Sequence, residues 1–362
     1  MIDANDRKMR RPRKATLKQV AELANVSSST ASMILNSKSG FSFSKDTVER
    51  VWNAAERLGF LQPAQQTPAK SVFQRKVVAI FSSTVTGYYY TALVQAIEQA
   101  AQQAQYETVC FQTYHTPTRE LSGLSMFSSS DIAGIIFTYT PVNYDMLDTL
   151  PDSIPVVVIG ESNPYIRKDM VELNNFAVGQ TMARHMLSLG HRKVAFLNDR
   201  FEWDGYPSTR RLKGAKDVFD GRPDAELIVL EQQAAGELSF GSYMTRRRAG
   251  YEMMRDCLRD HTDVTAVMAI TDVMAYGVLE AMRELGLRAP EDYSVSGFDN
   301  NLTSDLLELT TIEHHVFDIG VQAFHMLHTR IQNADKDLPG IVNRSELLCN
   351  LIHRRSTAPP RA

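Results

Sequence analysis

The polar side chains best suited to recognition chemistry are Asp299 and Arg211. Asp299 directly follows the apolar segment 294–298, and a carboxylate at such a place can accept hydrogen bonds from two adjacent hydroxyl groups. Arg211 begins an Arg-x-x-Gly pattern after the loop 199–208, and its planar guanidinium suits vicinal hydroxyls or a carboxylate. Because ligands of open α/β sheets bind beyond the carboxyl ends of the strands, both residues are predicted to line a ligand cleft.

Three consecutive tyrosines, Tyr88 to Tyr90, follow the first strand-like segment. An aromatic ring at this place can stack on the face of a pyranose. The alternative is packing beneath the helix that follows, and among three tyrosines in a row we expect at least one in each role. Tyr89 and Tyr90 are taken as ligand candidates.

Thr271 and Asp272 stand between a strand-like segment and a helical one. We assign Asp272 to the cap of that helix and Thr271 to the ligand, with ligand contact by Asp272 as the alternative. For Arg211 and Asp299, the alternative to ligand binding is a structural ion pair across the cleft.

No motif for catalysis accompanies these residues. The sequence contains no glycine-rich phosphate loop, no His-Glu-x-x-His, no nucleophile elbow and no paired-cysteine metal spacing. The pairs His314-His315 and His325/His328 lack a third ligand, so surface or core positions are favoured over a metal site. We therefore expect neither an enzyme nor a cofactor.

The segment 16–36, TLKQVAELANVSSSTASMILN, has the pattern of two short helices. Thr16 and Gln19 have the spacing of a capping box, and Ser27 can cap a second helix. Two short helices joined by about four residues form a helix-turn-helix, which places its second helix in the DNA major groove. An ordinary helical hairpin is the alternative. Ser44 can cap a third helix, which completes a small all-α head.

Charge is distributed unevenly along the 362 residues, although the net charge is only -3. Residues 1–75 hold 13 Lys and Arg against 6 Asp and Glu, whereas the remainder holds 26 against 36. A basic head on an acidic body suggests that the head alone meets a polyanion.

The overall composition, 43% hydrophobic and 22% charged, is that of a soluble globular protein. No apolar run approaches the roughly 20 residues needed to cross a bilayer, and the basic N-terminus is not followed by an apolar signal segment. Cys110, Cys257 and Cys349 are odd in number and far apart, which favours buried thiols in a reducing cytoplasm. We expect a cytoplasmic protein with no membrane partner.

From residue 76 onward, apolar strand-like segments alternate with amphipathic helical ones. This alternation predicts parallel sheets covered by helices on both faces. There are more strands than one mononucleotide-type sheet needs, so we predict two α/β subdomains. The strand-like segments are Val77–Phe81, Thr108–Gln112, Gly134–Phe137, Val156–Ile159, Val194–Leu197, Leu227–Leu230, Ala266–Ile270 and Ser294–Phe298.

Several motifs, in order and in spacing, carry a family resemblance. They include Thr16-Leu17-Lys18-Gln19-Val20-Ala21, Gly190-His191-Arg192-Lys193-Val194, Arg211-x-x-Gly214, Thr271-Asp272-x-Met274-Ala275-x-Gly277, Ser296-Gly297-Phe298-Asp299-Asn300 and Leu309-Thr310-Thr311-Ile312. With these motifs the chain resembles the lactose-repressor/galactose-repressor family of bacterial transcriptional regulators from about Thr16 to Thr357. The resemblance implies a helix-turn-helix head and a core of two doubly wound subdomains, like the periplasmic sugar-binding proteins.

The same resemblance implies roles in DNA binding. Ser28, Ser29 and Met33 fall where relatives read base edges, and Met33 can pack on a thymine methyl but cannot contact guanine bidentately. Caps and phosphate contacts are implied for others, with helix surface as the alternative for Ser32. These are Thr16, Ser27, Thr30 and Ser32, and Asn36 completes the DNA-binding set.

The resemblance also places domain boundaries. We predict a DNA-binding domain at 1–60 with an arm at 1–15, a linker at 61–75 and an effector-binding and dimerisation core at 76–362. The N-subdomain is expected at about 76–174 and 304–332 and the C-subdomain at about 177–300 and 337–357, with crossovers near 174–175, 300–304 and 330–340.

The linker departs from the family, in which a hinge helix inserts a leucine into the minor groove. Pro68 falls inside the corresponding segment and Ala69 replaces the leucine, which disfavours such a helix. No leucine heptad follows the core, so a homodimer is expected rather than a tetramer.

The sequence therefore predicts a repressor that binds an inverted-repeat operator in double-stranded DNA. A small-molecule effector, a sugar or sugar derivative, is expected between the core subdomains, at Tyr89, Tyr90, Arg211, Thr271 and Asp299. The alternatives are purine-type co-repression and a protein co-regulator. A solute-binding protein and an enzyme are less favoured.

Overall fold

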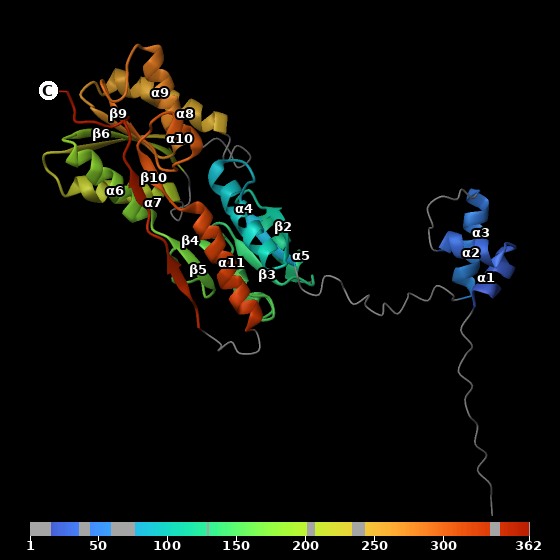
Figure 1. The fold of residues 1–362 in the computed structure, drawn as a ribbon. Coiled ribbons are helices and arrows are strands. Elements are labelled where there is room, and N and C mark those ends of the chain that lie inside the picture. Colours follow the sequence, from blue (N-terminus) through green and yellow to red (C-terminus); the bar gives the residue numbers. More distant parts are fainter. Residues whose placement is uncertain are drawn as a thin grey trace, which may run out of the picture. The chain divides into compact units, whose positions relative to one another are not determined.

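The computed structural model describes residues 16–35, 44–58, 77–128, 130–200, 207–233, 243–333 and 341–361. The chain divides into two compact units, Met1–Gln74 and Arg75–Ala362 (Figure 1). Each unit has its own buried apolar core.

The first unit contains the helices α1 (Leu17–Ala24), α2 (Ser28–Leu35) and α3 (Lys45–Arg57). The predicted capping box is confirmed: the Gln19 amide donates to Thr16 Oγ1 at 3.4 Å, and the Thr16 amide donates to Gln19 Oε1 at 2.8 Å. Asn25 takes a left-handed conformation with φ 54° and ends α1.

The second and third helices begin in a similar way. The Thr30 amide donates to Ser27 Oγ at 3.0 Å, and the Thr47 amide donates to Ser44 Oγ at 3.2 Å. Small and branched side chains from all three helices form the core of this unit, and they are Val20, Ala21, Ala24, Ala31, Ile34, Val51, Ala54 and Ala55. The close packing of these short helices is what presents α2 to the outside.

The second unit contains two lobes. The sheet of the N-lobe is parallel throughout and has the order β11-β5-β4-β3-β1-β2. Its strands are β1 (Val77–Ser82), β2 (Glu107–Gln112), β3 (Gly134–Phe137), β4 (Val156–Glu161), β5 (Asp169–Leu173) and β11 (Arg344–Glu346). Helices α4 (Tyr88–Gln103) and α11 (Val316–Gln332) pack together on one face (Figure 1). Helix α5 (Pro117–Ser128) and the short 3₁₀ helix η1 (Tyr144–Thr149) cover the other.

The sheet of the C-lobe is also parallel and has the order β7-β6-β8-β9. Its strands are β6 (Lys193–Arg200), β7 (Glu226–Gln233), β8 (Ala266–Ala269) and β9 (Ser294–Ser296). Two helix pairs flank it, α6 (Asn175–Ser188) with α7 (Pro207–Asp220) and α8 (Tyr243–Asp260) with α9 (Asp272–Glu284). The predicted fold class, an all-α head with a two-lobed parallel α/β core, is confirmed, and each of the eight predicted strand segments overlaps a strand.

Three crossovers join the lobes. The first lies at 174–175, between β5 and α6. The second lies at 314–315, after β10 (Thr311–Glu313) and before α11. Where the sequence suggested 300–304, the chain still belongs to the C-lobe: the short helix α10 (Leu302–Leu306) follows, and Leu309 and Ile312 pack in the C-lobe core.

The third crossover lies at 347–349, between β11 and β12 (Asn350–Ile352), and not within 330–340. Strand β11 pairs in parallel with β5 and so extends the N-lobe sheet before the chain returns to pair β12 with β10. Polar residues in β11, Arg344 and Glu346, gave no apolar strand signal.

The helix pair α6 and α7 is held by contact between backbones. A Cβ atom added at Gly214 would lie 2.0 Å from the carbonyl oxygen of Phe176, and one at Gly179 would lie 1.9 Å from that of Arg211. Gly250 and Gly277 allow the same approach between α8 and α9. These glycines fix the first turns of the four helices beside the carboxyl edge of the sheet.

Candidate functional site

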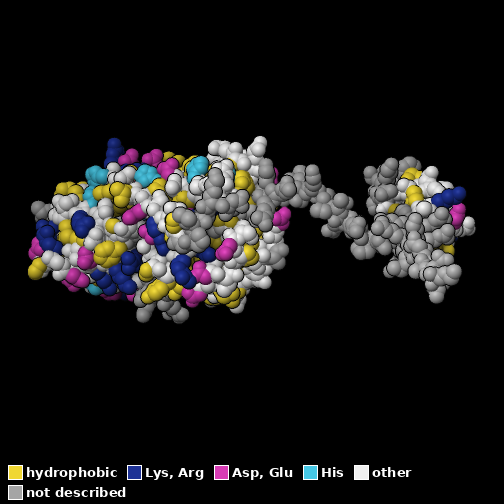
Figure 2. All heavy atoms as spheres, turned by 90° about the horizontal axis from the view of Figure 1, so that it is seen from below, with side chains coloured by type: hydrophobic (Ala, Val, Ile, Leu, Met, Phe, Trp, Pro, Cys, Tyr) yellow, Lys and Arg dark blue, Asp and Glu magenta, His cyan; other side chains and the backbone are white. Residues whose placement is uncertain are grey.

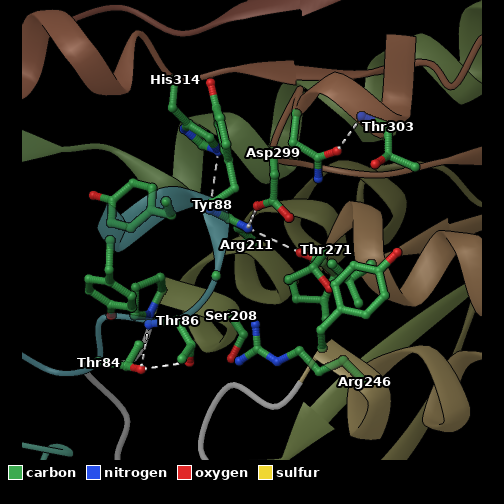
Figure 3. Close-up of a pocket in the computed structure, with 18 of the residues that line it drawn as sticks. Thr84, Thr86, Tyr88, Ser208, Arg211, Arg246, Thr271, Asp299, Thr303 and His314 are labelled. Carbon is green, nitrogen blue, oxygen red and sulfur yellow. Dashed lines mark hydrogen bonds and ion pairs between the residues drawn. The ribbon is translucent and has the colours of Figure 1, made fainter. Parts of the chain in front are cut away.

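A cavity of about 380 Å³ lies between the two lobes (Figure 3). Its volume falls in the range of small-molecule binding pockets. The N-lobe contributes the segment that leads into α4, and the C-lobe contributes the first residues of α7, α8 and α9. Because helices of a parallel sheet start where strands end, the cavity occupies the place predicted for a ligand.

The structure brings the five predicted effector residues together: Tyr89, Tyr90, Arg211, Thr271 and Asp299 all line this cavity. Arg211 and Asp299 both belong to the C-lobe: Arg211 lies on α7, and Asp299 lies three residues after the end of β9. The structural alternative, an ion pair across the cleft, is therefore wrong in its geometry. The two side chains do form an ion pair within one lobe, with Arg211 Nη1 3.8 Å from Asp299 Oδ1.

The guanidinium of Arg211 is held by several protein groups and is only 8% exposed. Its Nε donates to Asn175 Oδ1 at 2.7 Å, and its Nη1 donates to the carbonyl of Ile270 at 3.0 Å. Asn175 in turn donates to Glu161, at the end of β4. Through Asn175, in the first crossover, Arg211 is therefore linked to both lobes.

The second crossover reaches Arg211 through His314. Its Nε2 lies 2.6 Å from the carbonyl oxygen of Phe298 and 3.1 Å from Arg211 Nη2. Two acceptors would repel each other at 2.6 Å, so the single proton of this imidazole belongs on Nε2, which donates to Phe298. With its proton on Nε2, His314 has no lone pair there that could accept a hydrogen bond from Nη2 of Arg211. A ligand oxygen would complete the hydrogen bonding of that group.

The buried Asp272 holds Asp299 in place through two hydrogen bonds. The amide of Asp272 donates to Asp299 Oδ2, and the amide of Asp299 donates to Asp272 Oδ1, each at 3.0 Å. Thr311 Oγ1 also donates to Asp272 Oδ1 at 2.6 Å. Burial and the neighbouring charge of Asp299 raise the pKa of Asp272 to about 6. These bonds fix the Asp299 carboxylate at the cavity wall.

The predicted roles of Thr271 and Asp272 need one correction. Thr271 is the residue that caps α9, because its side chain accepts a hydrogen bond from the Met274 amide at 3.3 Å. Asp272 is the first residue of the helix, is fully buried, and does not cap it. Sequence alone could not separate these neighbours, since both residue types cap helices.

All three tyrosines line the cavity, but they differ in burial. Tyr88 is 48% exposed, whereas the rings of Tyr89 and Tyr90 are half-buried and meet edge to face at 5.2 Å. The hydroxyl of Tyr89 is buried without a hydrogen-bond partner. Burial raises the pKa of Tyr89, so the hydroxyl stays protonated and can donate. Tyr89 is thus a polar group of the N-lobe that a ligand can satisfy.

The cavity is also lined by residues that the sequence did not indicate as ligand contacts, among them Asn175, Ser208, Arg246 and His314. Asn175 was noticed only as a crossover, and His314 only as half of a histidine pair. Arg246 lies in a run of three arginines that reads as helix surface. Ser208 directly follows Pro207, a common first residue of helices, and this was the one available signal.

Burial of imidazoles predicts a loss of stability in acid. The pKa of His314 is lowered to about 3 by burial and by Arg211, and burial lowers those of His115 and His185 to about 4. In the unfolded chain these groups gain protons below about pH 6.5. Their contribution to stability is therefore complete above that pH and is lost as the pH falls toward the folded values.

We expect the free energy of unfolding of the core to fall between about pH 7 and about pH 5.5, by about 1 kcal/mol for the fully buried His314. Asp272 opposes the change, because its raised pKa favours the folded state as the pH falls below 6. Burial also raises the pKa of Glu161, so this residue too favours the folded state as the pH falls. As the pH falls from 7, the unfolded imidazoles begin to gain protons at a higher pH than Asp272 does in the folded state. Urea unfolding at both pH values measures the difference, and equal stability would contradict the assignment.

In the first unit, the predicted DNA-binding residues from Ser27 to Met33 lie on α2 or directly before it, whereas Thr16 caps α1. Thr16, Ser27, Ser28 and Ser29 are exposed, whereas Thr30, Ser32 and Met33 are half-buried. Asn36 and the linker with Pro68 lie outside the described residues. On the core, Figure 2 shows basic and acidic side chains interspersed over one face. Ser28 and Ser29 on α2 are open to solvent, and their contact with bases stays a prediction.

The described residues contain neither a metal-binding cluster nor a membrane-spanning helix. Within them no cluster of three His, Cys, Asp or Glu side chains is arranged to bind a metal ion. Nor does any described helix combine the length and hydrophobicity needed to span a bilayer.

Comparison with known proteins agrees with this architecture along the chain. Residues 16–62 match the model of the bacterial regulatory proteins of the lacI family. Residues 74–215 match the periplasmic binding proteins and sugar binding domain of the LacI family. Residues 183–357 match a periplasmic binding protein-like domain.

Curated relatives extend over almost the whole chain. The HTH-type transcriptional repressor PurR of Haemophilus influenzae (strain PittEE) is 27% identical over 346 residues, which are 94% of this chain and 98% of the relative. The HTH-type transcriptional regulator DegA of Bacillus subtilis (strain 168) is 25% identical over 354 residues, 96% and 99% of the two chains.

Solved structures show the same fold. A LacI-family transcriptional regulator from Silicibacter pomeroyi aligns with a TM-score of 0.68 at 24% identity, covering 96% of this chain and 100% of the other. The complex of the transcriptional regulator CelR with cellobiose aligns with a TM-score of 0.63 at 22% identity, covering 94% and 99%. With matching models for the head and for both parts of the core, the chain belongs to the lacI family of bacterial regulatory proteins.

Proposed function

We propose that this protein is a transcriptional repressor that binds an inverted-repeat operator and responds to a small molecule held between its lobes. The observation that carries the proposal is one cavity to which both lobes contribute recognition side chains, Tyr89 from the N-lobe and Arg211 and Asp299 from the C-lobe. A helix-turn-helix head on the same chain supplies the DNA-binding part.

The mechanism follows from linkage. A ligand that contacts Tyr89 and Asp299 at once bridges the lobes and favours one relative orientation over others. It alters operator affinity only through its differential affinity for these orientations. Arg211 is suited to transmit the change, because its hydrogen-bond partner Asn175 lies in the first crossover and His314, whose Nε2 is 3.1 Å from Arg211 Nη2, lies in the second.

We propose a sugar or sugar derivative as the ligand. Asp299 offers acceptors to adjacent hydroxyls, Arg211 Nη2 offers a donor, and the tyrosines offer aromatic faces. Structural neighbours were solved with bound ribose and with cellobiose, which supports this class. Induction is proposed. Co-repression is the alternative, and the direction of the change in operator affinity decides between them.

We also propose a homodimer that acts in the cytoplasm as a regulator and not as an enzyme. Two heads related by two-fold symmetry would occupy successive half-sites of the operator. Support comes from the end of α10, where Leu306 is 76% exposed and the following Leu307 is 45% exposed. Such exposed apolar side chains in a row are typical of a contact with another chain.

Selection of bound duplexes from a random DNA pool tests the DNA-binding part. We expect an inverted repeat, bound by a dimer at a ratio of two chains per site. Replacing Ser28 or Ser29 by alanine is expected to relax the preference at one position in each half-site, by about 1 kcal/mol. Lys18→Ala, on the exposed face of α1, is the control, because loss of a positive charge should weaken binding to all DNA sequences alike. A selection that yields no common sequence would contradict the proposal.

A further inference from the structure

Ser208 presents an unexplained polar group to the cavity. Its side chain is 6% exposed, and its hydroxyl has no hydrogen-bond partner among the described residues. A buried hydroxyl without a partner costs free energy, and such groups usually meet a ligand or an ordered water. Ser208 lies in the first turn of α7, a helix of 14 residues.

Arg246 reaches the same cavity from the first turns of α8, a helix of 18 residues. In Figure 3, Ser208 and Arg246 both lie on the side of the cavity opposite to His314 and Thr303. The starts of α4 and α9 also line the cavity, at Tyr88 and Thr271. Helix N-termini carry partial positive charge and unpaired amides, which favour anions.

Charged side chains divide the cavity into two ends. Among the described lining residues the charges are those of Arg211, Arg246 and Asp299. At the first end, the Asp299 carboxylate is balanced by the neighbouring Arg211 and accepts a hydrogen bond from the Asp272 amide. The second end contains Arg246, the Ser208 hydroxyl and the first turns of α7 and α8. Neutral hydroxyls suit the first end, and an anionic group suits the second.

We propose that the effector is a carbohydrate that bears an anionic group, a carboxylate or a phosphate, bound at Ser208 and Arg246. This inference rests on the proposed function and deepens it. Ring hydroxyls would meet Asp299 and Arg211, while the anionic group accepts hydrogen bonds from the Ser208 hydroxyl and the Arg246 guanidinium.

The test compares matched ligands on the full-length chain at constant ionic strength. Glucose, glucuronate and glucose 6-phosphate form one series, and galactose with its uronate and 6-phosphate forms a second. Inorganic phosphate at millimolar concentration probes the anion end by itself. Calorimetry and thermal shift measure affinity, since a ligand of the folded state raises the melting temperature. The uronate and phosphate arms tell which anion is preferred.

We expect at least one anionic sugar to bind about tenfold or more tightly than its neutral partner, a difference of about 1.4 kcal/mol. Arg246→Gln and Ser208→Ala should remove this preference and the thermal shift given by phosphate. Arg248→Gln is the matched control, because it lies on the same helix, is 80% exposed at its side chain and pairs with Glu252. Unliganded melting curves verify that each variant folds.

Two results would overturn the inference. Neutral sugars that bind as tightly as their anionic partners would do so, and so would anion affinity that is unchanged in Arg246→Gln. If neutral sugars bind and Asp299→Asn abolishes their binding, the proposed sugar response survives without the anion. If no sugar and no phosphate shifts the melting temperature, the sugar assignment falls as well.

Discussion

Replacing Arg211 by glutamine is expected to abolish the ligand response and to lower the free energy of unfolding of the core by about 3 kcal/mol. The substitution removes the donors to Asn175 and to the Ile270 carbonyl. It also leaves Asp299, beside the buried Asp272, without its neighbouring cation. Ligand affinity should fall about a hundredfold, because a charge-assisted contact in a buried site is lost.

Arg210→Gln provides the matched control at the adjacent position. The side chain of Arg210 is 45% exposed, and its Nε lies 3.7 Å from Glu161 Oε2. Because the Arg210 side chain is partly exposed and 3.7 Å from Glu161, whose side chain is 10% exposed, this variant should lose at most about 1 kcal/mol of stability and keep the ligand response. Chemical unfolding and calorimetry measure the two quantities. Equal behaviour of the two variants would show that Arg211 holds neither the crossovers nor the ligand.

Replacing Gly214 by alanine is expected to lower the free energy of unfolding by about 3 kcal/mol through overpacking of α6 against α7. The added methyl group would lie 2.0 Å from the carbonyl oxygen of Phe176, and a backbone atom cannot move aside as a flexible side chain can. The helices must separate, which also displaces Arg211 one turn earlier on α7. Loss of stability should therefore be accompanied by loss of ligand affinity.

Gly221→Ala is the control for Gly214→Ala. Gly221 directly follows α7, and the nearest atom to an added Cβ there is 3.8 Å away, an ordinary contact. Thermal unfolding of both variants, with and without the identified ligand, measures the effect. A Gly214→Ala protein as stable as the Gly221→Ala protein would show that the helix pair tolerates separation.

Much of the fold could be predicted because its signals are local. Thr16 and Gln19 cap a helix by their own spacing, and apolar runs such as 156–159 mark buried parallel strands. The strand β11 was not predictable in this way, because Arg344 and Glu346 owe their strand conformation to pairing with β5. The later crossovers were misplaced for the same reason. Tertiary pairing decided them.

The candidate site was predictable where a motif places a residue at a strand end, as with Asp299 and Arg211. It was not predictable where a helix start supplies the residue. Arg246 lies in a run of arginines whose neighbours Arg247 and Arg248 pair with Glu280 and Glu252 at the surface. His314 contributes through a crossover whose position only the structure defines. The burial of these side chains depends on both lobes together.

Coupling between the cavity and the DNA can be measured as operator affinity with and without ligand, on the wild type and on Asp299→Asn. We expect ligand to change the operator dissociation constant by about fivefold or more, and operator to change ligand affinity by the same factor. Asp299→Asn should keep operator binding and lose the change. If a ligand binds the cavity and leaves operator affinity unaltered, the cavity does not control DNA binding.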